Sequence, residues 1–316
     1  MNPIDRHDAH AGGPEPTLTV IVPAYNEEAN VGAVVRGILA QQEDGFALAR
    51  LIVASDGSTD GTVAVAESAA GGDARVTVVN DGNRLGKALR LNRELENVPS
   101  DIVAILDADI AFEHERVLAE LLAPMIRHAN IIHVSGSALP LAPETLVERI
   151  AYAGAMLWEI VRRSPSATPL YRSEGRIHAY RKTMYLKLRF PETSADEAYS
   201  FLFGEHEGFP FAVSDGALVR YRLPSTFRDY VLQMRRFLKS EEIQARTFGE
   251  AFVSRYYTIT LADKFRGLAT NLVADPVHTI LYALLIPLPR ILKAFDSRNG
   301  EHRWADVPST KRLLSR

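Results

Sequence analysis

The chain has 316 residues, 47% of them hydrophobic, which suffices for one large domain or one domain with an appendage and excludes wholesale disorder. It contains no cysteine, which excludes disulfide bonds and thiolate catalysis and fits a reducing cytosol. The net charge is −3, but residues 220–316 hold 17 basic and 9 acidic residues, whereas residues 1–219 hold 19 and 30. The basic last third predicts an anionic partner, either a phosphate-bearing acceptor or an anionic membrane. Nucleic acid is not the expected partner, because no recognisable binding motif accompanies the basic residues.

Short apolar runs alternate with helical periodicities in the first part of the chain. Residues 1–16 are polar and lack an apolar core, so we expect a loose tail rather than a signal peptide. The alternation that follows predicts a parallel sheet with right-handed crossovers, of the kind that binds nucleotides. The predicted strands are 18–22, 49–54, 75–79 and 102–106, and the predicted helices are 29–41, one ending near 70, and 88–96.

The second part of the chain becomes helical towards its end. Apolar patterning predicts helices at 115–128 and 144–163, strands at 131–136, 176–180 and 212–222, a helix near 195–203, and helices at 227–245, 257–273 and 276–295. The last of these contains the apolar run T-I-L-Y-A-L-L-I-P-L-P, which is too short to span a bilayer and is broken by Pro287 and Pro289. Two interpretations stay open: a buried terminal helix, or a helix that lies at a membrane interface.

The apolar run 102–106 ends in Asp107-Ala108-Asp109. In an extended chain residues i and i+2 point the same way, so the two carboxylates can converge on one ligand while Ala108 faces the core. Acids at the carboxyl end of a buried strand lie where open α/β sheets bind ligands, and two hard oxygen donors suit Mg²⁺ or Mn²⁺ with a phosphorylated substrate. The alternative is a polar strand end at which Asp109 caps the next helix.

Three other strand ends supply candidate ligands at the same sheet edge. The segment P-A-Y-N-E-E after the first strand can present backbone groups to a base or ribose. Asp56, after the second strand, can accept the N–H groups of uracil or guanine, whereas at least one of the next residues, Ser58, Thr59 and Asp60, is expected to cap a helix. Lys87 and Arg84 can approach a pyrophosphate at a helix start; the alternative for Lys87 is a solvated surface lysine.

Four motifs occur in order: P-A-Y-N-E-E, S-D-G-S-T-D-G-T, N-R-L-G-K-A-L and L-D-A-D. Together they resemble the glycosyltransferases of family 2, which have the GT-A fold. Three later segments extend the resemblance. G-R-I-H-A-Y-R-K, which begins at Gly175, resembles the family's acceptor-side strand. S-A-D-E-A-Y resembles its acidic pair, and Q-M-R-R-F resembles its Gln-x-x-Arg-Trp motif. The resemblance divides the chain into a nucleotide-sugar-binding half (17–112), an acceptor half (113–240) and a basic helical extension (241–316).

The resemblance implies a GT-A fold with a mostly parallel central sheet flanked by helices. It also implies an inverting, metal-dependent glycosyltransferase that moves one sugar from a nucleotide-diphosphate sugar, UDP-sugar favoured and GDP-sugar next, to a hydroxyl acceptor. The setting would be polysaccharide, glycolipid or cell-envelope glycan synthesis in the cytoplasm, with the C-terminal extension as a candidate contact with the inner face of the membrane.

The resemblance also assigns site residues. The donor side comprises Pro23, Ala24, Tyr25, Glu27, Asp56, Lys87, Asp107, Ala108 and Asp109. Within this group, Asp109 and Asp107 would hold Mg²⁺ or Mn²⁺. The base that deprotonates the acceptor would be Glu197 or Asp196, with Glu197 preferred by register. The acceptor or diphosphate side comprises His178, Gln233, Arg236 and Phe237.

Two departures from the family pattern matter. The acidic pair runs Asp-Glu instead of Glu-Asp, which leaves the identity of the base open. Phe237 replaces the family's Trp, which points away from a processive synthase. The alternatives are a catalytically idle relative that binds a nucleotide sugar or tethers partners at a membrane, and a sugar nucleotidyltransferase. The latter would need a Gly-rich, Arg-containing loop after the first strand, where P-A-Y-N-E-E stands instead.

Overall fold

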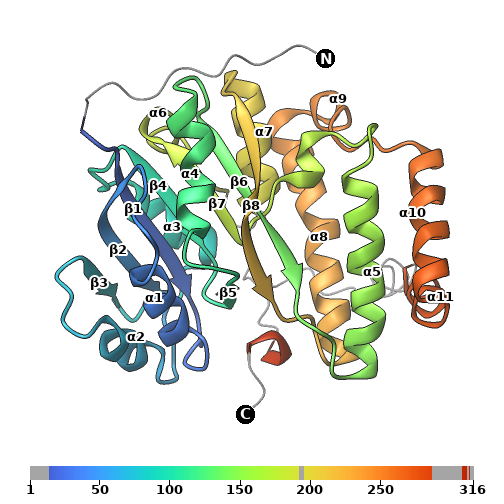
Figure 1. The fold of residues 1–316 in the computed structure, drawn as a ribbon, viewed down its shortest axis with the longest axis horizontal. Helices are drawn as coiled ribbons and strands as arrows, with labels where there is room; N and C mark the ends of the chain where they lie inside the picture. Colours follow the sequence, from blue (N-terminus) through green and yellow to red (C-terminus); the bar gives the residue numbers. More distant parts are fainter. Residues whose placement is uncertain (1–13, 192–195, 287–307, 312, 314–316) are drawn as a thin grey trace.

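The computed structural model describes residues 14–191, 196–286, 308–311 and 313, and of residues 196, 235–239 and 308 it describes only the backbone. An eight-stranded mixed sheet forms the centre of this part of the chain, in the order β3-β2-β1-β4-β7-β6-β8-β5 (Figure 1). Its strands are β1 (Thr17–Ala24), β2 (Ala47–Ser55), β3 (Val76–Val79), β4 (Ile102–Leu106), β5 (Ile110–Phe112), β6 (His133–Pro140), β7 (Ile177–Arg181) and β8 (Phe211–Tyr221).

The first four strands form the parallel half of the sheet that the alternating pattern predicts. β1 pairs in parallel with β2 and β4, and β2 pairs in parallel with β3. The second half is mixed: β7 is antiparallel to β4 and β6, β8 is parallel to β6, and β5 is antiparallel to β8. Four of the seven strand pairs in the described residues are therefore parallel, which agrees with a mostly parallel sheet. The three-residue strand β5 was not predicted.

Helices cover both faces of the sheet because the strands are apolar on both faces. Val20 and Val22 of β1 pack with α1 (Val31–Leu39), α2 (Thr62–Ala70) and α4 (Val117–Arg127). Ile21, which points the other way, packs with α3 (Lys87–Leu95), α6 (Lys182–Tyr185) and α7 (Asp196–Glu207). All five residues of β4 are fully buried, as expected of a central strand.

α5 and the helices that follow β8 form a helical layer beside the sheet (Figure 1). It consists of α5 (Leu146–Arg162), α8 (Phe227–Phe248), α9 (Glu250–Val253), α10 (Leu261–Ala274) and α11 (Pro276–Leu285). Gly154 on α5 makes room for Tyr282 of α11, since a Cβ at Gly154 would lie 2.2 Å from the tyrosine ring. The Tyr282 hydroxyl accepts a hydrogen bond from Trp158 Nε1 at 3.0 Å. α11 is thus held against α5 by one face.

Several predicted boundaries differ from the observed ones. α8 runs without interruption through residue 240, where the sequence suggested the end of the acceptor half. α10 begins at Leu261 rather than 257, because Thr260 caps it by accepting from the backbone N–H of Asp263 at 3.2 Å. α11 ends at Leu285, and the predicted continuation of this helix from 287 to 295 lies outside the described residues. None of the described helices combines the length and apolar character needed to cross a membrane.

Candidate active site

A cavity of about 150 Å³ lies at the carboxyl ends of β1, β2 and β4. Strand ends of a parallel sheet meet at one edge, which is why residues far apart in the sequence gather there. All nine residues assigned to the donor side line this cavity: Pro23, Ala24, Tyr25, Glu27, Asp56, Lys87, Asp107, Ala108 and Asp109. Gln233 of α8 lines it from the other side. The structure therefore brings together the candidate residues of four separate loops.

Lys87 and Asp107 form an ion pair inside the cavity, with Lys87 Nζ 2.6 Å from Asp107 Oδ1. Lys87 is the first residue of α3, and Gly86 before it has a φ of 93°, which a side chain rarely tolerates. The Lys87 side chain is only 16% exposed, so the alternative of a solvated surface lysine is wrong.

Asp109 is the second carboxylate of the motif. Its desolvation and the charge of Asp107 raise the pKa of Asp109, and the cations Arg176 and Lys87 oppose this effect. β5 begins directly after it, at Ile110, so Asp109 does not cap a helix. Two carboxylates held close together, one with a raised pKa, indicate a place where additional positive charge would be stabilised.

Arg176 is a site residue that the sequence interpretation missed. Its guanidinium carbon lies 3.7 Å from the centre of the Tyr221 ring, and its Nη1 lies 2.7 Å from Glu174 Oε1. Burial alone would lower the pKa of Arg176, but the charges of Glu174, Asp107 and Asp109 raise it, so the side chain stays cationic. The backbone N–H of Asp107 also donates to the carbonyl of Arg176 at 3.0 Å, which fixes the two residues side by side.

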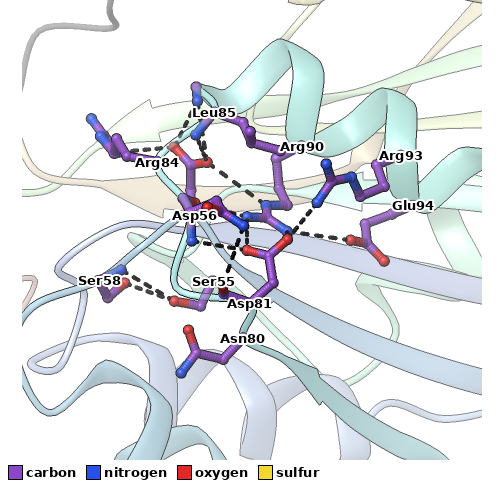
Figure 2. Close-up of polar contacts among 12 residues, drawn as sticks. Ser55, Asp56, Ser58, Asn80, Asp81, Arg84, Leu85, Arg90, Arg93 and Glu94 are labelled. Carbon is purple, nitrogen blue, oxygen red and sulfur yellow. Dashed lines mark hydrogen bonds and ion pairs between the residues drawn. The ribbon is translucent and has the colours of Figure 1, made fainter.

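Asp56 holds the loop that carries Lys87 (Figure 2). Its carboxylate accepts hydrogen bonds from the backbone N–H groups of Leu85 at 2.8 Å and Gly86 at 2.9 Å, and from Arg84 Nη1 at 2.9 Å. Gly57, with a φ of 71°, permits this approach, because a Cβ there would lie 3.0 Å from the backbone of Asn83 and Arg84. Asp56 therefore organises the loop in addition to lining the cavity.

Arg90 supports the same loop from beneath (Figure 2). It is completely buried, its Nη2 lies 2.7 Å from Asp81 Oδ1, and the same nitrogen donates to the carbonyl of Asn83 at 2.9 Å. A buried guanidinium with these partners fixes the turn between β3 and α3. The motif N-R-L-G-K contained no sign of this role, since Arg90 lies on a helix with the spacing of an ordinary surface arginine.

The first two loops are joined by side chains near the predicted capping residues. Asn26 has a positive φ of 54°, which asparagine tolerates better than most residues. Its Oδ1 accepts from the backbone N–H of Thr59 at 2.8 Å, and its own N–H donates to Ser58 Oγ at 3.1 Å. Asp60 accepts from the first-turn N–H of Thr62 at 3.0 Å, as expected of a residue at a helix start.

Glu27 is a third acid at the cavity. Burial and the charge of Asp109 raise the pKa of Glu27 to about 8, while Lys311, whose Nζ lies 3.4 Å from Glu27 Oε1, counteracts the rise. Lys311 and Thr310 also line the cavity, as do Arg84, Tyr221 and Arg222. The contribution from residues 310 and 311 was not predicted, because the resemblance ended near residue 240.

The acidic pair lies behind Arg176. The Glu197 side chain is partly exposed, and its Oε2 occupies the space beside Gly175, where a Cβ would lie 2.5 Å from it. Gly175 immediately precedes the cavity residue Arg176, so Glu197 lies beside the cavity wall without being part of it. The side chain of Asp196 lies outside the described part of the structure.

The structure places His178 away from the cavity and does not describe the side chains of the other two acceptor-side candidates. His178 is completely buried in the middle of β7, with its ring centre 4.9 Å from that of Tyr180, and it does not line the cavity. Contrary to the prediction, it therefore belongs to the core, because alternation along β7 turns it into the sheet–helix interface. Arg236 and Phe237 lie in α8, but their side chains are outside the described part.

The donor set fits a divalent cation that shares its ligands with a substrate. Asp107 and Asp109 offer hard oxygen donors at one edge of the cavity. The described residues contain no group of three or more His, Asp or Glu side chains that could hold a metal alone. Mg²⁺ and Mn²⁺ suit two carboxylates completed by phosphate oxygens and water.

Comparison with known proteins agrees with this geometry. Residues 19–141 match the model of the family described as "Glycosyl transferase family 2". Over 95 residues the chain is 35% identical to 4,4'-diaponeurosporenoate glycosyltransferase of Staphylococcus aureus (strain USA300), a match that covers 30% of this chain and 24% of that protein. The protein of the same name from strain bovine RF122 / ET3-1 is 37% identical over 98 residues. The chain thus matches about a quarter of the length of these curated relatives.

Two solved structures resemble the whole fold. A mannosyltransferase from Pyrobaculum calidifontis, in complex with GDP-Man and Mn²⁺, superposes with a TM-score of 0.57 at 21% identity, covering 88% of this chain and 83% of that one. Glucosyl-3-phosphoglycerate synthase from Mycobacterium tuberculosis, in complex with Mn²⁺, UDP and phosphoglyceric acid, gives 0.50 at 21% identity, covering 71% and 78%. The chain has the GT-A fold, which it shares with both of these structures. Residues 19–141 are similar to glycosyltransferase family 2.

Proposed function

We propose that this protein is an inverting, metal-dependent glycosyltransferase that moves a single sugar from a nucleotide-diphosphate sugar to a hydroxyl acceptor. The observation that carries the proposal is the convergence of Asp107, Asp109, Lys87 and Arg176 at the ends of β4, α3 and β7. Two acids and two cations at one sheet edge are suited to hold a diphosphate together with a cation.

Inverting transfer is one displacement at the anomeric carbon, in which the acceptor oxygen forms a bond as the bond to the diphosphate breaks. The leaving nucleoside diphosphate gains negative charge, which Lys87 and Arg176 are placed to stabilise. A cation bound by Asp107 and Asp109 would add to this stabilisation as a Lewis acid.

The acceptor hydroxyl must lose its proton to a base on the other side of the sugar. Glu197 is our candidate, because its carboxylate lies against Gly175, next to the cavity residue Arg176. Asp196 is the alternative, because the Asp-Glu order of the pair does not decide which of the two carboxylates is the base.

Solved structures with this fold and the curated relatives support particular donor and acceptor classes for the proposal. Solved structures with this fold bind GDP-Man or UDP together with Mn²⁺, which supports a UDP- or GDP-sugar donor here. One neighbour binds phosphoglyceric acid, and the curated relatives are named for the glycosylation of 4,4'-diaponeurosporenoate. We place the reaction in polysaccharide, glycolipid or cell-envelope glycan synthesis.

A membrane-facing surface supports a lipid-linked or membrane-bound acceptor. Large apolar side chains are exposed along the outer face of α10 and α11: Leu261, Phe265, Val277, Ile280 and Leu284. Their spacing places three of them on one stripe of α11, opposite the face that packs on α5.

The charges of this surface complement an anionic lipid layer. Lys264 and Arg266 are exposed on α10. Asp263, which directly precedes Lys264, is buried. An exposed apolar stripe flanked by cations is typical of a helix that lies in the headgroup region. We therefore infer that the protein acts at the cytoplasmic face of a membrane, as a peripheral protein.

The test of the proposed function is release of nucleoside diphosphate. Purified protein with Mn²⁺ or Mg²⁺, UDP- and GDP-sugars and a panel of hydroxyl acceptors is expected to release UDP or GDP in an acceptor-dependent way. A catalytically idle relative would bind a nucleotide sugar without turnover. Absence of release with every donor would contradict the proposal.

A further inference from the structure

Residues 308–311 and 313 lie at the cavity, although they are far in sequence from the other residues that line it. In Figure 1 this short red segment lies beside the ends of β1 and β8. It contains the 3₁₀ turn Pro308–Thr310, and Thr310 and Lys311 line the cavity. The segment thus adds a wall to a site whose other walls come from residues 23–233.

One set of contacts ties the segment to the acceptor half. The backbone N–H of Ser309 donates to Asp229 Oδ2 at 3.0 Å, and the backbone N–H of Ser225 donates to Ser309 Oγ at 3.1 Å. Arg222 Nη2 donates to the carbonyl of Leu313 at 3.2 Å. Asp229 is itself almost completely buried, so this anchor is not a loose surface contact.

A second set ties the segment to the donor half. Lys311 Nζ donates to the carbonyls of Tyr25 and Asn26, the latter at 3.2 Å, and pairs with Glu27. Two residues on, the backbone N–H of Leu313 donates to Asn30 Oδ1 at 3.0 Å, and the Leu313 side chain is only 5% exposed. The segment therefore bridges the two halves of the cavity.

Lys311 contacts the loop of Tyr25, Asn26 and Glu27, which we expect a nucleoside to contact. The Tyr25 ring lies between two cations, with Arg84 Cζ 3.1 Å and Lys311 Nζ 5.1 Å from its centre. Lys311 also fixes the backbone carbonyls of Tyr25 and Asn26, the latter a residue with a positive φ, and supplies a positive charge beside Glu27.

We propose that Lys311 is a donor-positioning residue, and that binding of a nucleoside diphosphate and docking of residues 308–311 and 313 stabilise each other. Lys311 holds Tyr25 and Asn26 in the conformation that lines the cavity, and it adds to the lining a positive charge that a diphosphate would meet. Because both events use one conformation of the 25–27 loop, each favours the other by the same factor. The inference takes its ligand, a nucleoside diphosphate, from the proposed function.

The first experiment measures UDP and GDP binding to the full chain in the presence of Mn²⁺ by calorimetry. The variant Lys311→Met is expected to bind the preferred nucleotide about tenfold more weakly, since it loses charge-assisted hydrogen bonds. Lys311→Arg is expected to recover part of the affinity, because it restores the charge and donors. The matched control is Lys264→Met, which removes an exposed lysine of α10 and is expected to leave the affinity unchanged.

The second experiment measures hydrogen–deuterium exchange of the backbone amides of residues 308–313 and 25–30. The nucleotide is expected to slow exchange in both segments of the native chain, and Lys311→Met is expected to abolish the slowing in residues 308–313. Native affinity in Lys311→Met, or no change of exchange on nucleotide binding, would overturn the inference while leaving the proposed function intact. If the native chain binds neither UDP nor GDP, both the inference and the proposed function are wrong.

Discussion

The ammonium of Lys87 lies 2.6 Å from the Asp107 carboxylate and joins the first turn of α3 to the end of β4. The cavity therefore contains its own counter-charge when no cation or nucleotide is present. A bound cation would compete with Lys87 for Asp107, and an incoming diphosphate would attract Lys87 away from it. This relationship makes the two ligands interdependent.

The variant Lys87→Gln is expected to affect the two ligands in opposite directions. Without nucleotide it should bind Mn²⁺ more tightly, because Asp107 loses its competing cation. With Mn²⁺ present it should bind UDP or GDP about tenfold more weakly, because the diphosphate loses a charged donor. Titration calorimetry measures both, and Lys182→Gln, an exposed lysine on α6, is the control. Unchanged Mn²⁺ affinity would contradict the competition.

Exchange of the two candidate bases should identify which one acts. We expect Glu197→Gln to lower kcat by about a hundredfold or more, the usual contribution of a general base, with the melting temperature unchanged. Asp196→Asn is the matched variant and is expected to retain most of the activity. Nucleoside diphosphate release under single-sugar transfer conditions gives both values. A larger loss in Asp196→Asn would assign the base to Asp196 instead.

Arg90 should contribute to stability as well as to the donor loop. Arg90→Met leaves Asp81 and the Asn83 carbonyl without their buried donor, which is expected to lower the free energy of unfolding by about 3 kcal/mol. Arg93 also contacts Asp81, but it is half exposed, so Arg93→Met should cost less than about 1 kcal/mol. Urea denaturation compares the two. Equal losses of the free energy of unfolding in the two variants would show that the burial of Arg90 does not contribute to stability.

Stability should fall in mild acid because of His133. This ring is completely buried, and burial, followed by the charge of His178, holds its pKa well below the usual 6.5. Below pH 6.5 the unfolded chain takes up a proton that the folded chain does not, so the free energy of unfolding decreases as the pH falls, by up to about 1.4 kcal/mol per pH unit for this group.

The matched pair of variants for this effect is His133→Phe and His206→Gln. Phenylalanine has a similar shape and cannot be protonated, so the first variant should flatten the dependence of stability on pH between 6.5 and 5. His206 lies exposed on α7, and its replacement should leave the dependence as it is. Urea denaturation at several pH values measures the slopes. Equal slopes in native protein and His133→Phe would contradict the assignment.

The outer face of α11 should bind anionic vesicles. The double variant Ile280→Asp, Leu284→Asp removes two exposed apolar side chains and adds negative charge, so partitioning onto phosphatidylglycerol-containing vesicles should fall by at least about tenfold. Leu186→Asp, which changes an exposed leucine outside this face, is the control. Sedimentation with vesicles gives the fractions bound. Equal binding of all three proteins would show that this face is not the membrane contact.

The donor half could be predicted from the sequence because its signals are local. Each strand there is a short apolar run that ends in Gly, Asp or Asn, and parallel strands bring such ends to one edge. Asp56, Lys87 and Asp109 were found in this way. The physical role of Asp56 in holding Leu85 and Gly86 was not, since it depends on the close approach of two loops, which Gly57 permits.

The rest of the site depends on contacts between distant parts of the chain. Arg176 and Lys311 reach the cavity because β7 pairs with β4 and because residues 311 and 313 contact the donor half. His178 was misplaced for the opposite reason: a motif can show that a strand borders a site, but alternation along the strand decides which side chains face it. Burial of His178 follows from the register of β7 with β4, which pairs it with Ile105.

The short connection between β4 and β5 determines the shape of the sheet beside the cavity. β4 and β5 are four positions apart in the sheet order, about 19 Å in a flat sheet, yet only the stretch from Leu106 to Ile110 connects them, and it spans at most about 14 Å. The sheet must therefore curl so that β8 brings Tyr221 opposite Ile110. Asp107 and Asp109 lie in the connection between β4 and β5, where the sheet curls. The pairing of Ile110 with Tyr221 therefore ties the backbone next to Asp109 to the end of β8.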